Sequence, residues 1–259
     1  RSLAYIAPLA RMAAGAGAQV DALLDAYRTG GGVSWAQFGT DVRESQADLN
    51  RPWFERLPET FAGVGRVHAV LSRPGARIAD VGTGGGWSSI ALAQGYPGLQ
   101  VDGFDVDAPS IALARANAEA AGVADRVRFH VADGASLERH APFDAVFAFE
   151  CIHDMPQPVD VLHAMRRSVA DGGIVIVMDE AVGDHVDAPG ELDPVMYAFS
   201  LFVCLPDGMS HAPSVGTGTL MRPDTLRDYA RAAGFEDVTV LPIEGFGFWR
   251  FYDLRFDAA

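Results

Sequence analysis

Residues 80–86 read Asp-Val-Gly-Thr-Gly-Gly-Gly (DVGTGGG), and this stretch decides the fold. An apolar strand is expected before it over Arg77–Val81, and a helix after it over Trp87–Gln94. Glycines at such a junction let the backbone pass close to a ligand and turn sharply into the helix. The stretch therefore predicts a ligand-binding loop, although a tight turn without a ligand uses the same residues.

Two common ligands of such loops are disfavoured by particular residues. The dinucleotide fingerprint Gly-x-Gly-x-x-Gly needs a glycine at position 87, where the chain has Trp87. A P-loop needs a lysine, and the 20 basic residues of the chain are all arginine. The loop therefore argues against an NAD-dependent oxidoreductase and against a P-loop nucleotidase.

Beyond the loop, apolar strands alternate with helices, which is typical of a parallel sheet covered on both faces. Further strands are expected over Val101–Asp105, Val127–Val131, Phe143–Phe149 and Ile174–Met178, and helices over Pro109–Ala121, Val159–Val169 and Pro223–Ala233. Phe235–Leu241 and Phe246–Tyr252 are expected to pair as a terminal antiparallel hairpin. The predicted fold class is α/β, a Rossmann-like, mostly parallel sheet of seven strands.

The first 73 residues are expected to be helical. Apolar residues recur at helical spacing in two runs, Leu3, Ile6, Leu9 and Met12, then Val20, Leu23, Leu24 and Tyr27. Aromatic residues follow in expected short helices or turns, with Pro52 at a helix start. The turn at Arg73–Gly75 is the predicted boundary between a cap over residues 1–73 and a ligand-binding domain over residues 74–259. A proline-rich, irregular insertion at 182–222 is expected to cover the substrate.

Composition narrows the function classes. The formal net charge is −14, which should repel phosphate backbones and anionic membranes, so a small-molecule partner is expected rather than nucleic acid. No apolar run spans a bilayer and no signal segment opens the sequence, which predicts a soluble, cytoplasmic protein. Cys151 and Cys204 lie in apolar surroundings without CxxC spacing, so two buried thiols are expected.

The run Asp80-x-Gly82-x-Gly84-x-Gly86 resembles motif I of class I S-adenosylmethionine-dependent methyltransferases. The resemblance spans roughly residues 77–255. It implies that Gly82, Thr83, Gly84 and Gly86 cradle the amino-acid end of the cofactor, which carries no phosphate. The acidic Asp80 then suits the ammonium group of the cofactor and the neighbourhood of its sulfonium.

Two further acidic residues follow the next two strands, where the resemblance requires them. Asp105 ends the second strand, 25 residues after Asp80, and is placed to accept hydrogen bonds from a ribose diol, with Val106 flanking the adenine. Asp133, followed by Gly134, comes after the third strand. The resemblance implies that Asp133 accepts a hydrogen bond from the adenine amino group. Each acid alone is more often a solvated strand end. Three in register predict one site for S-adenosylmethionine.

Three short stretches look like a bacterial subgroup of this family: Ala26–Gly30, Asn50–Pro52 and Cys204–Pro206. Members of that subgroup carry a winged-helix-like dimerisation segment ahead of the catalytic domain, which implies a homodimer. Most of that segment is expected upstream of Arg1. The same resemblance allows a rival function, a cofactor-sensing transcriptional regulator whose upstream winged helix binds DNA.

The fourth strand leads to the candidate catalytic group. Glu150, which ends the strand, is expected beside the cofactor, because ligands gather at the carboxyl ends of such strands. His153 lies in a run that resembles the His-Asp-Trp run of plant phenolic O-methyltransferases, which implies a general base for an acceptor hydroxyl. Asp179 or Glu180, after the fifth strand, is expected to orient the imidazole, and the sequence leaves that choice open. A histidine that only caps the next helix is the plainer alternative.

The acceptor is expected to lie beneath the insertion. Its predicted walls are Met196, Tyr197, Phe199, Phe202, Met209 and His211, with Tyr27 or Trp35 folding over from the N-terminal helices. No metal is expected, although a site joining His153 to Asp154 and His211 is conceivable. The predicted function is methyl transfer from S-adenosylmethionine to a small, largely apolar or aromatic acceptor at a hydroxyl oxygen, with C- or N-methyl transfer as alternatives.

Overall fold

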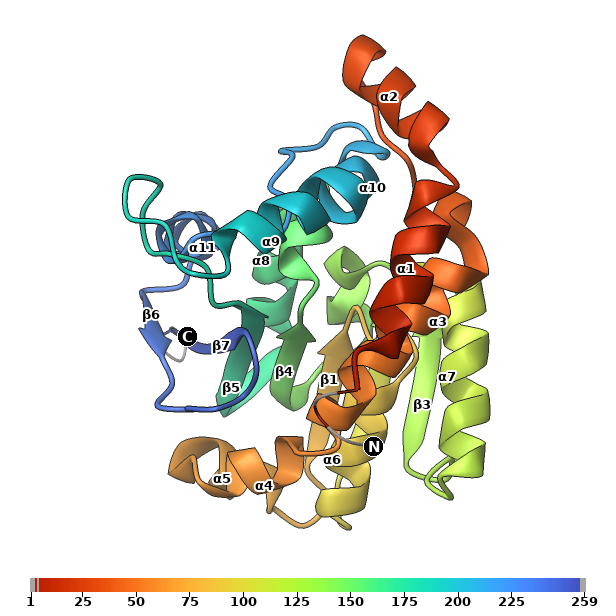
Figure 1. Ribbon diagram of the computed structural model, residues 1–259. Coiled ribbons are helices and arrows are strands. Elements are labelled where there is room, and N and C mark those ends of the chain that lie inside the picture. Colours follow the sequence, from red (N-terminus) through yellow and green to blue (C-terminus); the bar gives the residue numbers. More distant parts are fainter. Residues whose placement is uncertain (1–2, 4, 257–259) are drawn as a thin grey trace.

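Seven strands form one sheet in the computed structural model, which describes residue 3 and residues 5–256 (Figure 1). The strands are β1 (Arg77–Val81), β2 (Gln100–Asp105), β3 (Val127–Val131), β4 (Phe143–Phe149), β5 (Val169–Glu180), β6 (Asp237–Val240) and β7 (Trp249–Arg255). They lie in the order β3-β2-β1-β4-β5-β7-β6. β1 to β5 are parallel, and β7 runs antiparallel to β5 and β6. The predicted fold class is confirmed.

Successive residues of the central strands pack into opposite layers. Phe147 of β4 joins a core under α4 (Leu57–Ala62), α5 (Gly65–Leu71), α6 (Trp87–Gly95) and α7 (Ala108–Ala120). Its neighbour Val146 joins a second core under η1 (Gly134–His140), α8 (Pro158–Ser168) and α11 (Pro223–Ala232). The sheet is therefore apolar on both faces, as a covered parallel sheet requires.

The N-terminal region forms α1 (Ala7–Gly17), α2 (Val20–Thr29) and α3 (Trp35–Phe54), with α1 packed on α3 around Met12 and Phe38. The expectation of short helices or turns after Gly32 holds only at the start of α3, because the non-helical Gly39, with φ of 74°, separates residues 35–38 from the longer helical stretch that ends at Phe54. Pro52 lies inside its last turns rather than at a helix start. Burial of the following Phe54 against Phe149 holds this end in place despite the proline.

The insertion is more regular than predicted. It contains α9 (Asp193–Phe199), a π-helical turn η3 (Ser200–Cys204) and α10 (Leu205–Met209), which follow one another over the carboxyl edge of the sheet (Figure 1). Pro194 occupies the first turn of α9, where a missing N–H leaves no helical hydrogen bond unmade. Pro206 comes directly after the π-helical turn and lies inside one continuous helical stretch. Neither proline breaks the helix, whereas the sequence predicted an irregular segment.

Two boundaries also differ from the prediction. The second strand of the terminal hairpin begins at Trp249 rather than Phe246, after Gly245 and Gly247 with φ of 69° and 61°. β5 begins at Val169, with an irregularity opposite Phe143 before regular pairing resumes.

Among the described helices, none is long and apolar enough to cross a membrane.

Candidate active site

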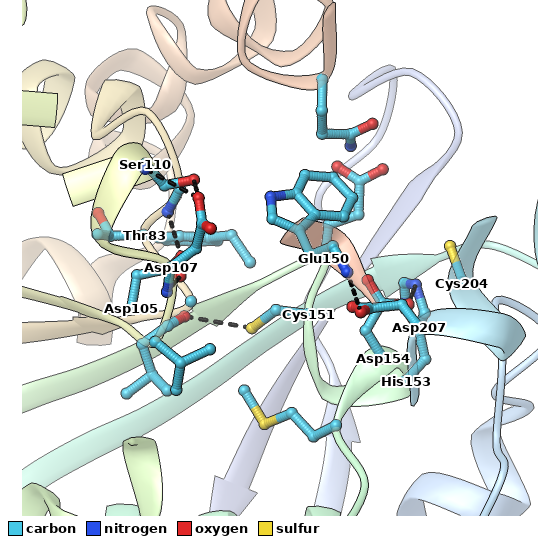
Figure 2. Close-up of a pocket in the computed structure, with 18 of the residues that line it drawn as sticks. Thr83, Asp105, Asp107, Ser110, Glu150, Cys151, His153, Asp154, Cys204 and Asp207 are labelled. Atoms are coloured by element: carbon cyan, nitrogen blue, oxygen red, sulfur yellow. Dashed lines mark hydrogen bonds and ion pairs between the residues drawn. The ribbon is translucent and has the colours of Figure 1, made fainter. Parts of the chain in front are cut away.

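A cavity of about 600 Å³ opens at the carboxyl ends of the central strands (Figure 2). The strand order reverses between β1 and β4, and ligands of open α/β sheets bind at such a reversal. The glycine loop after β1 and the turn after β4 line the cavity, together with α3 and the α9–α10 segment. Figure 2 shows two groups of side chains, separated by Cys151. We call them the loop end (Thr83, Asp105, Asp107 and Ser110) and the histidine end (Glu150, His153, Asp154, Cys204 and Asp207, with Glu180 beside His153).

The glycine loop needs glycine for more than one reason. Gly82, Gly84 and Gly86 have φ of 69°, 52° and 78°, a region that side chains rarely adopt. A Cβ on Gly84 would meet open space, consistent with its place on the cavity wall. A Cβ on Gly86 would lie 2.7 Å from the ring of Phe129, and Gly86 does not line the cavity. The expectation that Gly86 cradles a ligand is therefore corrected: it permits close packing behind the loop.

Asp80 lies beneath the loop and not at the cavity wall. Its Oδ2 accepts hydrogen bonds from the hydroxyls of Thr83, Ser88 and Ser89 at 2.9, 2.6 and 2.6 Å. Burial raises the pKa of Asp80, and these hydrogen bonds oppose that rise. The predicted contact between Asp80 and an ammonium group is not what the structure shows. Its carboxylate shapes the loop from behind, while Gly82 and Thr83 reach the cavity.

At the loop end, each acidic side chain already has donors. Asp105 accepts from the backbone N–H of Gly84 at 2.9 Å and of Asp107 at 2.8 Å. Asp107 forms an ion pair with Arg43 of α3 at 2.6 Å and accepts from Ser110. The sequence reading missed Arg43 and Asp107. The Asp107-x-x-Ser110 spacing before a helix is a capping signal that could have identified Asp107, whereas nothing local marks Arg43.

The loop end fits a nucleoside without phosphates. Val106 lines the cavity and is 68% exposed, an apolar surface left uncovered beside Asp133 and Gly134. Arg43 is the one arginine among the described residues that line the cavity, and Asp107 already neutralises it. A sugar and a base can use the carboxylates and Val106, whereas a pyrophosphate would find no free cation. Asp105, Val106, Asp133 and Gly134 are thus brought together as predicted.

His153 lies at the other end, in the short helix η2 (Ile152–Asp154) that follows β4. Phe149 pairs with Met178 of β5, so the residues that follow the two strands lie side by side. His153 Nδ1 lies 2.8 Å from Asp179 Oδ1 and 3.3 Å from Glu180 Oε2, and only the first contact is a hydrogen bond. Asp179 is thus the partner that orients the imidazole in this geometry, whereas Glu180 lines the cavity.

The second nitrogen of His153 also faces a carboxylate. Nε2 lies 3.0 Å from Asp154 Oδ1. Burial disfavours the charged imidazolium, but the charges of Asp154, Asp179 and Glu180 outweigh it and raise the pKa of His153 well above its usual value. These neighbouring charges favour the protonated imidazole over the neutral one.

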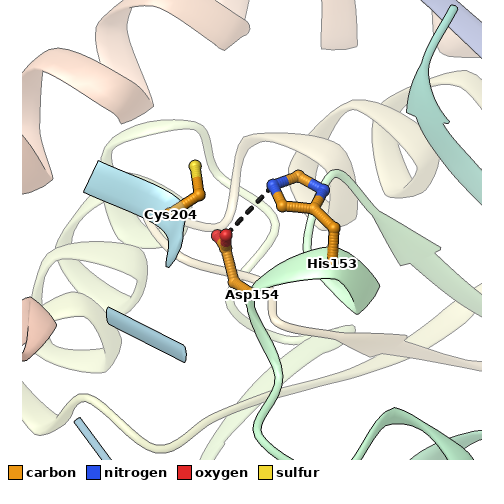
Figure 3. A group of neighbouring side chains, drawn as sticks. All are labelled: His153, Asp154 and Cys204. Atoms are coloured by element: carbon orange, nitrogen blue, oxygen red, sulfur yellow. Dashed lines mark ion pairs between the residues drawn. The ribbon is translucent and has the colours of Figure 1, made fainter. Parts of the chain in front are cut away.

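The donor atoms of His153, Asp154 and Cys204 lie within 4.8 Å of one another, and Figure 3 shows Asp154 between the other two. Imidazole, carboxylate and thiolate are ligands that zinc or iron accepts. His153, Asp179 and Glu180 form a second such group. His211, the third ligand of the metal site considered from sequence, lines the cavity but belongs to neither group.

The helical segment α9–η3 decides which predicted wall residues face the cavity. Met196, Phe199 and Val203 recur at helical spacing and line it, as do Trp35 and His211. Tyr197 and Phe202, on the opposite side of the same helix, are exposed, and Met209 does not line the cavity. Tyr27 is likewise outside, where its hydroxyl donates to the carbonyl of Leu201 at 2.7 Å. The predicted roles of Tyr27, Tyr197, Phe202 and Met209 as walls are therefore wrong.

Two carboxylates of the histidine end hold helix α3 and α10 in place. Asn50 Nδ2 donates to Glu150 at 2.6 Å, and the backbone N–H of Trp35 donates to Asp207 at 2.6 Å. Burial raises the pKa of Glu150 to about 7 and that of Asp207 to about 7. Asn50 and Asp207 were not predicted, because they come from segments far from the glycine loop in sequence.

Both cysteines are free, half-buried and line the cavity. The Cys151 thiol donates to the carbonyl of Val81 at 3.2 Å. Burial raises the pKa of both thiols, so neither is a thiolate nucleophile at neutral pH. The expectation of two buried thiols holds only in part, because both are free but half-buried, and their place at the cavity was not anticipated.

A family model described as a methyltransferase domain matches residues 78–173. That stretch contains the glycine loop and strands β2 to β4, so the chain is similar to methyltransferases over this part. The chain is similar to the ubiquinone biosynthesis O-methyltransferase of Pseudomonas aeruginosa strain LESB58, with 31% identity over 162 residues, 62% of this chain and 65% of that protein. It therefore spans less than two thirds of the length of that relative.

Two solved structures share the fold. An O-methyltransferase family protein from Burkholderia thailandensis superposes with a TM-score of 0.69 and 17% identity, over 97% of this chain and 72% of that chain. An O-methyltransferase from neocarzinostatin biosynthesis, solved with S-adenosylmethionine and 2-hydroxy-5-methyl naphthoic acid, superposes with a TM-score of 0.58 and 18% identity, over 96% and 70%. At these identities the likeness extends to the fold, including the N-terminal helices.

Proposed function

We propose that this protein transfers a methyl group from S-adenosylmethionine to a hydroxyl oxygen of a small-molecule acceptor. The observation that carries the proposal is the hydrogen bond between the buried residues His153 and Asp179, because His153 lines the same cavity as the glycine loop. The curated relatives named as O-methyltransferases support the same reaction.

The loop end is the proposed cofactor site. Gly82, Thr83 and Gly84 would hold the amino-acid end, while Asp105, Val106, Asp133 and Gly134 would hold the sugar and base. The bound cofactor supplies an electrophilic methyl group on a sulfonium. Asp80 and Gly86 serve this site indirectly, because they fix the conformation of the loop. Glu150, at the histidine end, is kept as a proposed cofactor neighbour.

His153 is the proposed general base, and Asp179 positions it. The hydrogen bond from Nδ1–H to Asp179 leaves Nε2 as the atom that accepts a proton from the acceptor. Asp154 Oδ1 lies 3.0 Å from Nε2, so the acceptor hydroxyl has to replace Asp154 there. Alignment of the acceptor with the methyl group supplies the larger part of the acceleration.

The test compares binding with turnover in the intact protein. Calorimetry should register binding of S-adenosylhomocysteine to both the wild type and His153→Ala, because His153 lies outside the loop end. Methyl transfer, followed by mass spectrometry with a panel of phenols, should fall by about 10² to 10⁴ in His153→Ala. Absence of cofactor binding by the folded wild type contradicts the function, and unchanged turnover removes His153 from the mechanism.

We also propose a homodimer in the cytoplasm, with residues 1–73 as cap and dimerisation region and residues 74–259 as the catalytic domain. The apolar residues Val20, Leu24, Leu201 and Phe202 are exposed on α2 and η3, which supports burial of this face in a dimer. Size-exclusion chromatography with light scattering tests the dimer, and Leu24→Glu should make the protein monomeric.

A further inference from the structure

The histidine end carries more carboxyl groups than basic side chains. Glu150, Asp154, Glu180 and Asp207 all line it, and no arginine does among the lining residues of the described chain. His153 is its central cation and is already engaged by Asp179 and Asp154. Arg43, the arginine of the cavity, is paired with Asp107 at the loop end.

Buried acceptor atoms at this end also lack donors. Glu180 is 3% exposed, and its Oε2 receives no hydrogen bond from the described residues. Asn50 is 6% exposed and gives its amide N–H to Glu150, yet its Oδ1 has no partner in the described part of the chain. Both residues line the cavity. Because buried polar atoms are normally hydrogen-bonded, a ligand that brings donors is expected here.

We infer that the acceptor carries a protonated amine in addition to its hydroxyl, and that Glu150, Glu180 and Asp207 hold this amine at the histidine end. The inference rests on the proposed function and names its substrate class. An ammonium group brings three donors and a positive charge, whereas a second hydroxyl brings one donor and no charge. An acceptor with a carboxylate is excluded by the same groups.

The titration of these acids agrees with the geometry. Burial raises the pKa of both Glu150 and Asp207 to about 7, and that of Glu180 well above its usual value, so the empty site holds part of its carboxyls protonated. A cation placed beside them favours the ionised form and restores charge pairing. Aromatic and apolar walls at Trp35, Met196 and Phe199 would cover the rest of such a molecule.

The experiment uses three phenols that differ in one group. Calorimetry measures the binding of tyramine, 4-propylphenol and 3-(4-hydroxyphenyl)propanoate to the protein saturated with S-adenosylhomocysteine, which lacks the sulfonium charge. Tyramine should bind at least about tenfold more tightly than 4-propylphenol, equivalent to ~1.4 kcal/mol, and the propanoate should bind most weakly. Equal or tighter binding of the neutral phenol, or no binding of tyramine at millimolar concentration, overturns the inference.

Charge-removing variants locate the amine. Asp207→Asn and Glu150→Gln keep the shape of the side chain, and each should weaken tyramine binding by about threefold or more without changing 4-propylphenol binding. Asp160→Asn is the matched control, because Asp160 is an exposed carboxylate at the rim of the same cavity and is screened by water. If only Asp160→Asn lowers the preference for tyramine over 4-propylphenol, the assignment of the amine to Glu150 and Asp207 is contradicted.

Two further outcomes are separable. If S-adenosylhomocysteine does not bind, the proposed function fails; if it binds and the phenols are not discriminated, only the amine is overturned. Metal analysis of the purified protein tests whether the histidine end binds a metal ion instead of an amine. Stoichiometric zinc or iron that His153→Ala removes would assign the acids to a metal and overturn the amine.

Discussion

The two ends of the cavity differ in how their acidic groups are satisfied. At the loop end the carboxylates of Asp105 and Asp107, and that of Asp80 behind them, accept two or more hydrogen bonds or an ion pair from the protein. At the histidine end Asp179 Oδ2 and Glu180 Oε2 lack hydrogen-bond donors among the described residues. Asp80 Oδ1, behind the loop, lacks a donor among these residues as well, so the difference concerns the acids that line the cavity: Asp105 and Asp107 are hydrogen-bonded by the protein, whereas Glu180 Oε2 is not.

This difference bears on what each end can recognise. A fully hydrogen-bonded network is rigid and specifies one geometry, which suits a cofactor of fixed structure. Unpaired buried acceptors are costly, and the cost is relieved when a ligand supplies the missing donors. Specificity for the acceptor should therefore depend on the histidine end, and affinity for the cofactor on the loop end.

The largest effect is expected from a side chain placed behind the glycine loop. Gly86→Ala puts a Cβ 2.7 Å from Phe129 and 2.9 Å from Ala114, on a backbone with φ of 78°. We expect a loss of ~3 kcal/mol in the free energy of unfolding, from strain plus overpacking. Urea denaturation measures it.

Gly122 supplies the control for that substitution. Its φ is 69°, but a Cβ there meets nothing within 4 Å, so Gly122→Ala should cost about 1 kcal/mol from backbone strain alone. Equal losses in the two variants would show that packing behind the loop does not constrain Gly86.

A smaller effect separates the two ends by cofactor affinity. Asp105→Asn replaces one carboxylate oxygen with an amide N–H that faces a backbone donor of Gly84 or Asp107. Affinity for S-adenosylhomocysteine should fall by about thirtyfold, or ~2 kcal/mol. Asp207→Asn, the same change at the histidine end, should leave that affinity within about twofold. Calorimetry measures both affinities. Comparable losses of affinity for S-adenosylhomocysteine in the two variants would contradict the assignment of cofactor binding to the loop end.

The sequence predicted the loop end better than the histidine end, for a physical reason. Asp105, Val106 and Asp133 follow strands whose order and direction are set by local apolar patterns, so position in sequence fixes position in space. Asp80 and Gly86 were placed in the correct loop with the wrong contacts, because a motif does not say which side of the backbone faces the ligand. Only the Cβ positions and hydrogen bonds show that.

The histidine end depends on contacts between distant segments. Asn50 meets Glu150 across 100 positions, and Trp35 meets Asp207 across 172 positions. Such pairings follow from how α3 and α10 pack, which no local spacing encodes. The predictions for Tyr27 and Tyr197 failed for the same reason. Their residue type suggested that they line the acceptor cavity, but the rotation of each helix about its axis places both side chains outside it.

The finest test of the comparison is the pH dependence of turnover. Asp154, Asp179 and Glu180 raise the pKa of His153, so the neutral base forms only as the pH rises, and turnover should increase toward alkaline pH. Asp154→Asn removes one of these charges, lowers the pKa of His153 and should move the rise about one unit toward acid. Arg11, Glu44 and Asp41 form an exposed cluster that does not line the cavity, so Glu44→Gln should leave the profile in place. An unchanged or alkaline-shifted profile in Asp154→Asn means that His153 is not the group whose ionisation limits turnover, and the histidine end then binds the acceptor without removing its proton.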